Sequence, residues 1–207
     1  MRYYFYFSIP VLQQALSLWA LLMVFVVPTL WWFGRHLPAR RLLRRIAATG
    51  VLVLYATGVI AYTFLPLPDN DSFVCPDGWG STYPRFFLGW SIEFAIAAND
   101  GLLGAIFSIY VLQMLLNVLL FVPFGVLARW RWGASFRTVL FAAFGTSLAI
   151  ELTQLTGIWG YYDCAIRTFD AEDIFNNTLG AVLGWGALAT WQYRHTLPGQ
   201  LRRLFGR

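Results

Sequence analysis

Five apolar segments of about 20 residues divide this chain, and they constrain its fold more than any other feature. The segments cover residues 14–33, 46–65, 105–128, 138–155 and 173–193. A helix needs about 20 apolar residues to cross the hydrocarbon layer of a bilayer. We therefore predict an all-α integral membrane protein, built as a bundle of about five transmembrane helices.

The composition agrees with a membrane protein and argues against a soluble one. Hydrophobic residues make up 58% of the chain and charged residues 12%, whereas soluble domains carry roughly 25% charged residues. The mean hydropathy is +0.59. A net charge of +5 does not indicate nucleic-acid binding here, because the arginines are spread over short loops between apolar segments. We expect the lipid bilayer as a partner, no nucleic acid and no cofactor.

The positions of the arginines predict the topology. They lie in the first loop, in the third loop and in the C-terminal tail, whereas the second and fourth loops are acidic on balance. Arginine-rich loops stay in the cytoplasm, so five spans with the N-terminus outside and the C-terminus inside satisfy all three regions. The first apolar segment is too long for a cleavable signal peptide and lacks its flanking features. We expect an N-terminal span with its Arg-rich cytoplasmic loop at 1–45, a transmembrane domain at 46–195 and a basic cytoplasmic tail at 196–207.

The second loop, 66–104, contains an apolar stretch at 86–98 that is too short to span a bilayer. We interpret it as an interfacial or re-entrant helix at the outer face. A helix buried inside the loop is an equally good interpretation of the same residues.

Polar side chains gather where the last two predicted spans reach the outer face. Glu151 and Gln154 share one face of the fourth span, because they are three residues apart. Asp173 and Asn177 share one face of the fifth span in the same way. We expect the four side chains to meet near the outer leaflet, with the loop residues Arg167 and Asp170 closing over them.

Charged groups inside a bilayer are costly, at roughly 2.5–3.5 kcal/mol each, so they are paired, hydrated or used. We predict general acid–base roles for the three carboxylates Glu151, Asp170 and Asp173. The predicted substrate-binding residues are Asn117, Gln154, Arg167 and Asn177. An ion-paired clamp that fixes the order of the helices and performs no chemistry is the alternative interpretation.

Asn117 has two interpretations of its own. It lies near the middle of the third span, where its amide can donate to Glu151 or form a structural hydrogen bond to a neighbouring helix. Gly180 and Gly184 form a G-x-x-x-G pattern on the fifth span, which allows close approach of another helix.

The cysteines fall in predicted outer loops and the histidines in predicted cytoplasmic loops. Cys75 and Cys164 both fall in predicted outer loops, where a disulfide is the natural interpretation and two free buried thiols are the alternative. His36 and His195 fall in cytoplasmic loops, far from the carboxylates. No ligand spacing for a metal is present, so we expect no metal site.

Three motifs in order along the chain resemble the VanZ-like family, which takes its name from a teicoplanin resistance protein. The pattern N-x-x-x-F-x-P-x-G falls on Asn117, Phe121, Pro123 and Gly125, and E-x-x-Q falls on Glu151 and Gln154. The pattern R-x-x-D-x-x-D-x-x-x-N-x-x-G-x-x-x-G falls on Arg167, Asp170, Asp173, Asn177, Gly180 and Gly184.

The resemblance covers roughly residues 50–192 and implies a multi-pass protein of the bacterial plasma membrane. It also implies a role in the cell envelope, with some members lowering susceptibility to teicoplanin-type lipoglycopeptides. The implied partners are lipid-linked cell-wall precursors or lipoglycopeptides.

Three hypotheses for function follow from the sequence. The first is an outer-face site that binds or modifies a lipid-linked or amphiphilic substrate. The second is a non-catalytic membrane binding protein whose polar cluster is structural. The third is a transporter of lipids or small molecules, against which the absence of an evident inverted repeat argues.

Overall fold

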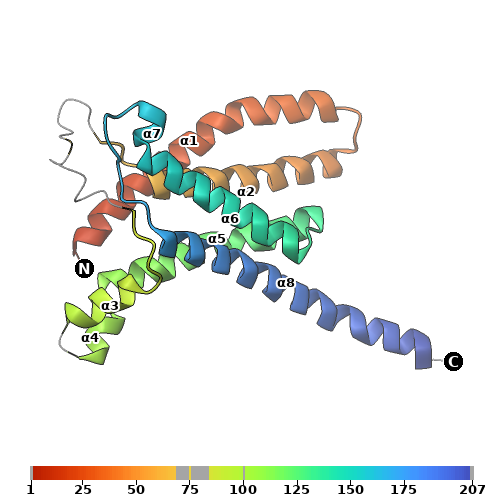
Figure 1. Ribbon diagram of the computed structural model, residues 1–207. Coiled ribbons are helices and arrows are strands. Elements are labelled where there is room, and N and C mark those ends of the chain that lie inside the picture. The colour runs from red at the N-terminus through yellow and green to blue at the C-terminus, as the bar shows by residue number, and fades with distance from the viewer. Residues whose placement is uncertain (1, 69–74, 76–83, 100, 206–207) are drawn as a thin grey trace. The chain divides into compact units, whose positions relative to one another are not determined.

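The computed structural model describes residues 2–68, 75, 84–99 and 101–205, with side chains described for 9–68, 75, 84–99, 101 and 103–194. The chain divides into two compact units, Met1–Ser72 and Phe73–Arg207. Most acidic residues of the second loop and the arginines at 202–207 lie outside the described side chains. The described part is helical throughout, apart from its loops and one isolated bridge, and Figure 1 shows its helices.

The first unit contains α1 (Arg2–Gly34) and α2 (Ala39–Phe64), which pack against each other. The Trp19 indole donates a hydrogen bond of 3.0 Å to the Gly50 carbonyl oxygen and so joins the two helices. Prolines set the boundaries of α2, since Pro38 precedes its first turn and Pro66 follows its last. A proline lacks the N–H that would continue a helix.

The second unit contains the remaining helices (Figure 1) and the residues of the predicted polar cluster. These helices are α3 (Trp90–Ala97), α4 (Leu102–Ile106), α5 (Ile109–Trp132), α6 (Phe136–Leu155), α7 (Gly157–Gly160) and α8 (Ala171–Phe205). The apolar stretch predicted at 86–98 therefore does form a helix, α3, which packs on α5. Its location at the membrane surface stays a prediction.

Four described helices are long and apolar enough to cross a membrane. They are Ile9–Gly34, Ala39–Phe64, Ile109–Trp132 and Phe136–Leu155. These match the first four predicted spans, with boundaries shifted by up to seven residues. The helix α8 is 35 residues long but is not among the four. Its first turns carry acidic and amide side chains, so the fifth span stays a prediction.

Serine caps and a glycine fix the ends of α5 and α6. The Ser108 hydroxyl accepts the Val111 N–H at 3.3 Å, and the Ser135 hydroxyl accepts the Thr138 N–H at 3.2 Å. Gly133 ends α5 in the left-handed conformation, with φ of 62°. Such caps satisfy helix-end groups that would otherwise lack partners. Three residues join the two helices, so they form an antiparallel pair.

The helix α8 packs along both α5 and α6, and glycines bring α5 and α8 into backbone contact. A Cβ atom on Gly180 would overlap the Val118 carbonyl oxygen, and one on Gly184 would overlap the Val122 carbonyl oxygen. Both residue numbers rise together along the contact, so α5 and α8 run parallel. The G-x-x-x-G pattern therefore allows the predicted close approach, and its partner is α5.

One face of α5 is buried against α8 and carries the first of the three motifs. Its buried residues are Asn117, Phe121 and Gly125, each four positions after the last. A Cβ atom on Gly125 would overlap the Ala181 carbonyl oxygen. Residues four apart share a helix face, so the motif describes the surface on which α8 packs.

Candidate functional site

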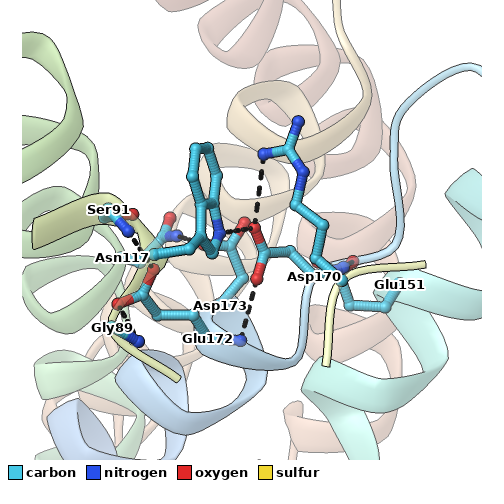
Figure 2. Close-up of polar contacts among 9 residues, drawn as sticks. Gly89, Ser91, Asn117, Glu151, Asp170, Glu172 and Asp173 are labelled. Carbon is cyan, nitrogen blue, oxygen red and sulfur yellow. Dashed lines mark hydrogen bonds and ion pairs between the residues drawn. The ribbon is translucent and has the colours of Figure 1, made fainter. Parts of the chain in front are cut away.

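The polar cluster lies where α6 ends and α8 begins. Glu151 comes from the last turns of α6, Asp170 immediately precedes α8, and Asp173 lies in the first turn of α8. Asn117 reaches the cluster from α5, as Figure 2 shows. The predicted convergence of carboxylates at this end of the helices is therefore present in the second unit.

Glu151 is 3% exposed. Its carboxylate accepts the backbone N–H of Asp170 at 2.8 Å (Figure 2). The charges of Asp173, Asp170 and Arg167 all act on Glu151. This hydrogen bond links the end of α6 to the start of α8 across the intervening loop.

Asn117 donates a hydrogen bond of 2.5 Å to the Asp173 carboxylate. Of the two interpretations from the sequence, the hydrogen bond to a neighbouring helix is confirmed, because the amide donates to Asp173 of α8, and the donation to Glu151 is wrong. The contact joins α5 to the first turn of α8. Acidic residues in that turn are favoured by the helix dipole.

Asp170 is the most connected residue of the cluster. One carboxylate oxygen accepts the Glu172 N–H at 2.9 Å, and the other accepts the Trp90 indole N–H at 2.6 Å. The same oxygen lies 3.8 Å from the Arg85 guanidinium. Burial raises the pKa of the Asp170 carboxyl above its ordinary value of 3.8, against the opposing effects of these donors and of Arg85. Asp170 is therefore poised to hold or release a proton nearer to neutral pH than an exposed aspartate.

Glu172 ties the start of α8 to α3. It is buried, and its two oxygens accept the Gly89 N–H at 3.1 Å and the Ser91 N–H at 3.2 Å (Figure 2). These N–H groups belong to the first turn of α3, where backbone donors lack helical partners. Glu172 therefore fixes α3 beside the cluster and is a structural member of it.

Two buried asparagines extend the polar surface along α8. The Asn177 amide donates to the Ser147 hydroxyl of α6 at 2.9 Å. Among the described residues, the Asn177 side-chain oxygen and the Asn176 side-chain nitrogen have no hydrogen-bond partner. A buried polar atom without a partner costs about 1–3 kcal/mol, so these atoms are available to a water molecule or a ligand group.

The other two predicted binding residues differ in exposure. Gln154 is 4% exposed, on the same side of α6 as Glu151, and its backbone carbonyl accepts the Ile166 N–H. Arg167 is exposed, and its charge acts on Glu151 and Asp173. Within the described residues, the ion pair of the cluster is made by Arg85, and Arg167 makes none.

Cys75 and Cys164 form a disulfide, as predicted from their shared outer loops. The bond joins the segment before Arg85 to the loop before α8. A second link between the same segments is the pair of backbone hydrogen bonds that Arg85 forms with Phe169 and Ala171, at 2.8 and 2.9 Å. Both links hold the loops beside the carboxylates.

The arrangement provides proton donors and acceptors together with amide groups for orientation. Four carboxylates, those of Glu151, Asp170, Glu172 and Asp173, lie within one hydrogen-bonded region that also includes an indole and a guanidinium. No group of three or more metal-ligating side chains occurs in the part of the chain that the structure describes. General acid–base chemistry and polar recognition are the functions that these side chains can perform.

Four residues of the cluster were absent from the sequence predictions of the site: Arg85, Trp90, Ser147 and Glu172. Ser147 precedes Glu151 by one helical turn, so periodicity alone could have found it. Arg85 is the lone cation of an otherwise acidic loop, which was a weaker indication. Nothing local indicates Trp90 or Glu172, because their partners lie about 80 positions away.

Comparison with known proteins places the chain in a family. Neither the search of curated proteins nor the search of solved structures found a match. A model of the VanZ/LLP1 family matches residues 52–192, which include α5, α6, the polar cluster and the glycine contacts of α8. This match covers more than half of the chain, and the protein therefore belongs to the VanZ/LLP1 family.

Proposed function

We propose that this protein acts at the outer face of the bacterial plasma membrane, where its polar cluster binds and modifies a lipid-linked or amphiphilic substrate. Lipid-linked cell-wall precursors and lipoglycopeptides of the teicoplanin type are the substrate classes that fit. The physiological result is a lowered susceptibility to such antibiotics. The proposal rests on one observation above all, the burial of Glu151, Asp170 and Glu172 together where α6, a helix suited to a membrane, ends and α8 begins.

The cost of burying the acids supports a function. Glu151 and Asp170 are 3% and 7% exposed, and ionised groups are almost never buried to this degree without a partner or a use. Their donors are two backbone N–H groups and the Trp90 indole N–H. Among the described residues, one guanidinium lies in ion-pair range of these two acids, that of Arg85 at 3.8 Å from Asp170. These partners only weakly compensate the negative charges, so the carboxylates can exchange protons with a bound substrate.

Each residue has a role in this proposal. Glu151 is the general acid or base. Asp170 and Asp173 accept protons from it and return them. Asn117 positions Asp173, while Gln154 and Asn177 orient polar groups of the substrate. Arg167, which is exposed at the same end, attracts an anionic headgroup.

The test compares conservative substitutions of the acids with matched controls. Glu151→Gln and Asp173→Asn remove a charge inside the cluster, whereas Glu93→Gln and Asp163→Asn make the same chemical changes at exposed positions. Each variant is expressed in a strain lacking the gene, and teicoplanin susceptibility is measured at matched membrane abundance. We expect the cluster variants to behave like the null strain and the controls to behave like wild type. Wild-type susceptibility of Glu151→Gln, beside a sensitive null strain, would exclude the proposal.

The structural clamp is a second candidate, and a specific observation favours it. Glu151, Glu172 and Asp173 each accept hydrogen bonds from other segments of the second unit, so they link its helices. If the cluster is only a clamp, Glu151→Gln lowers the thermal unfolding temperature and the abundance, and the phenotype follows abundance. If the cluster is a working site, the phenotype is lost at unchanged abundance.

A further inference from the structure

A groove of about 450 Å³ lies beside the polar cluster. It is lined by Arg85, Phe86, Phe87, Trp90, Phe94 and Tyr110. One cation thus stands among five aromatic rings. A groove of this composition presents a place for a charged group and a place for an apolar one.

Arg85 is held rigidly but retains its donors. Its backbone pairs with Phe169 and Ala171, and its guanidinium stacks 3.8 Å from the centre of the Trp90 ring. The Asp170 carboxylate lies 3.8 Å away, beyond hydrogen-bond distance, and the Arg85 side chain is 44% exposed. In the described part of the chain, no side-chain hydrogen bond uses the five N–H groups of this guanidinium. A planar arginine fork of this kind matches a phosphate group.

Aromatic side chains form the rest of the groove lining, beginning with Trp90. Trp90, Phe94 and Tyr110 pack edge to face or tilted, with ring centres 5.1 to 6.0 Å apart. Phe86 and Phe87 are 72% and 63% exposed. Large exposed aromatic side chains are typical of surfaces that contact lipid at the membrane interface.

We propose that this groove binds a phosphate-bearing membrane lipid, with the phosphate on Arg85 and one chain against Phe86, Phe87 and Phe94. The proposal rests on the function proposed above and specifies its substrate class. The position of Asp170 connects the two sites, because it contacts both Trp90 and Arg85 while its neighbours Glu172 and Asp173 begin α8. A lipid phosphate held on Arg85 would therefore lie at the edge of the carboxylate cluster.

The two parts of the groove commit the proposal to an amphiphile. Arg85 provides complementary charge for the phosphate, and the aromatic rings provide apolar surface for a chain. A free phosphate would use only the first, and a neutral lipid only the second. Each fragment alone should bind more weakly than the whole lipid.

The test is native mass spectrometry of the purified full-length protein, titrated with dioleoylphosphatidylglycerol. Parallel titrations use glycerol 3-phosphate, which lacks the chains, and dioleoylglycerol, which lacks the phosphate. We expect the phospholipid to bind at least about tenfold more tightly than either fragment, because dioleoylglycerol lacks the charge-assisted contact and glycerol 3-phosphate lacks the apolar contact. Equal binding of dioleoylglycerol and the phospholipid overturns the role of Arg85.

Variants locate the binding. Arg85→Ala should weaken phospholipid binding about tenfold. The matched control is Arg131→Ala, because Arg131 also stacks on a tryptophan, with its guanidinium 6.0 Å from the Trp132 ring, but lies at the other end of α5. Equal losses in both variants would mean a general surface-charge effect and would overturn the proposal.

A second variant tests the groove without disturbing the fold. Phe87 is exposed, so Phe87→Ala should leave the thermal unfolding temperature unchanged. It should weaken binding of the dioleoyl lipid and leave a dihexanoyl lipid unaffected, since the short chains make less contact. Unchanged binding of the dioleoyl lipid removes the chain-binding role of the groove.

The lipid-binding assay and the susceptibility assay can refute the two proposals independently. Retained lipid binding by Arg85→Ala, together with a lost phenotype in Glu151→Gln, overturns the groove and leaves the proposed function intact. Lost binding by Arg85→Ala with a wild-type phenotype in Glu151→Gln overturns the proposed function and leaves a lipid site.

Discussion

At the scale of single residues, the cluster is held together by donors that come from the backbone and from amides. Glu151 accepts a backbone N–H, Asp173 accepts an amide N–H, and Asp170 accepts a backbone N–H and an indole N–H. Hydrogen bonds to a charged group contribute about 1.5–3 kcal/mol. Such donors orient carboxylates without neutralising them, which suits a site that must exchange protons.

The contact between Asn117 and Asp173 yields a stability prediction. Asn117→Ala leaves the Asp173 carboxylate with one donor fewer and should lower the free energy of unfolding by about 1–3 kcal/mol. The matched control is Gln113→Ala, an amide removed from an exposed position one turn earlier on α5. Thermal unfolding of both variants in detergent measures the effect. Equal midpoints for the two variants would mean that the contact does not stabilise the fold.

Asp170 yields a prediction of pH dependence. Its pKa is raised in the folded protein, so the folded state holds the proton more tightly than the unfolded chain. The contribution of Asp170 to stability therefore falls as the pH rises from its ordinary pKa of 3.8 through the raised value. We expect the unfolding temperature of the wild type, relative to Asp170→Asn, to decline over this range. A difference that does not change with pH contradicts the assignment.

At the scale of helices, close backbone contact between α5 and α8 sets the geometry of the site. Gly180 and Gly184 rest on carbonyl groups of α5, which brings Asn117 within reach of Asp173. The helix α6 completes the arrangement through Ser147 and Glu151. The two glycines thus position Asn117 and Asp173, although the glycines themselves take no part in the chemistry.

The glycine contact is tested by matched substitutions on one helix. Gly180→Ala places a methyl group against the Val118 carbonyl and should cost about 1–3 kcal/mol through overpacking. At Gly186 a Cβ atom would meet nothing within 4 Å, so Gly186→Ala should be neutral or slightly stabilising. Thermal unfolding measures both variants. A Gly180→Ala variant as stable as Gly186→Ala would contradict the close contact.

Much of the helix content could be predicted from the sequence, because hydropathy and proline or glycine boundaries act locally. The segment 138–155 corresponds to α6 within two residues, and the segment 46–65 lies in α2, which begins seven residues earlier. The convergence of Glu151, Asp170 and Asp173 also followed from helix periodicity and topology. The glycine pattern could not name its partner, since G-x-x-x-G indicates close approach to any helix.

The remainder of the site depends on contacts between segments far apart in the chain. Trp90 and Arg85 reach Asp170 across about 80 positions, held in part by a backbone bridge between Arg85 and Asp170. No local periodicity encodes such a contact. The sequence therefore indicated Arg167 as the arginine that closes over the acids, whereas the ion pair among the described residues is made by Arg85.

At the scale of the whole molecule, the account depends on which side of the membrane the cluster faces. Within the second unit, α5 and α6 meet at a short turn flanked by Arg129, Arg131 and Arg137. Arginines of this kind stay in the cytoplasm. In the topology we propose, the opposite ends of these helices, where the carboxylates lie, face outward, and α8, which packs parallel to α5, is the fifth span.

The outward orientation of the cluster is the claim on which the proposed function most depends, and thiol labelling in spheroplasts tests it directly. The native cysteines are paired in a disulfide, so single cysteines introduced as Glu93→Cys and Arg137→Cys report opposite ends of the second unit. The account predicts that a membrane-impermeant maleimide labels Glu93→Cys in intact spheroplasts and labels Arg137→Cys only after permeabilisation. Labelling in the reverse pattern would place the carboxylates in the cytoplasm and contradict the account.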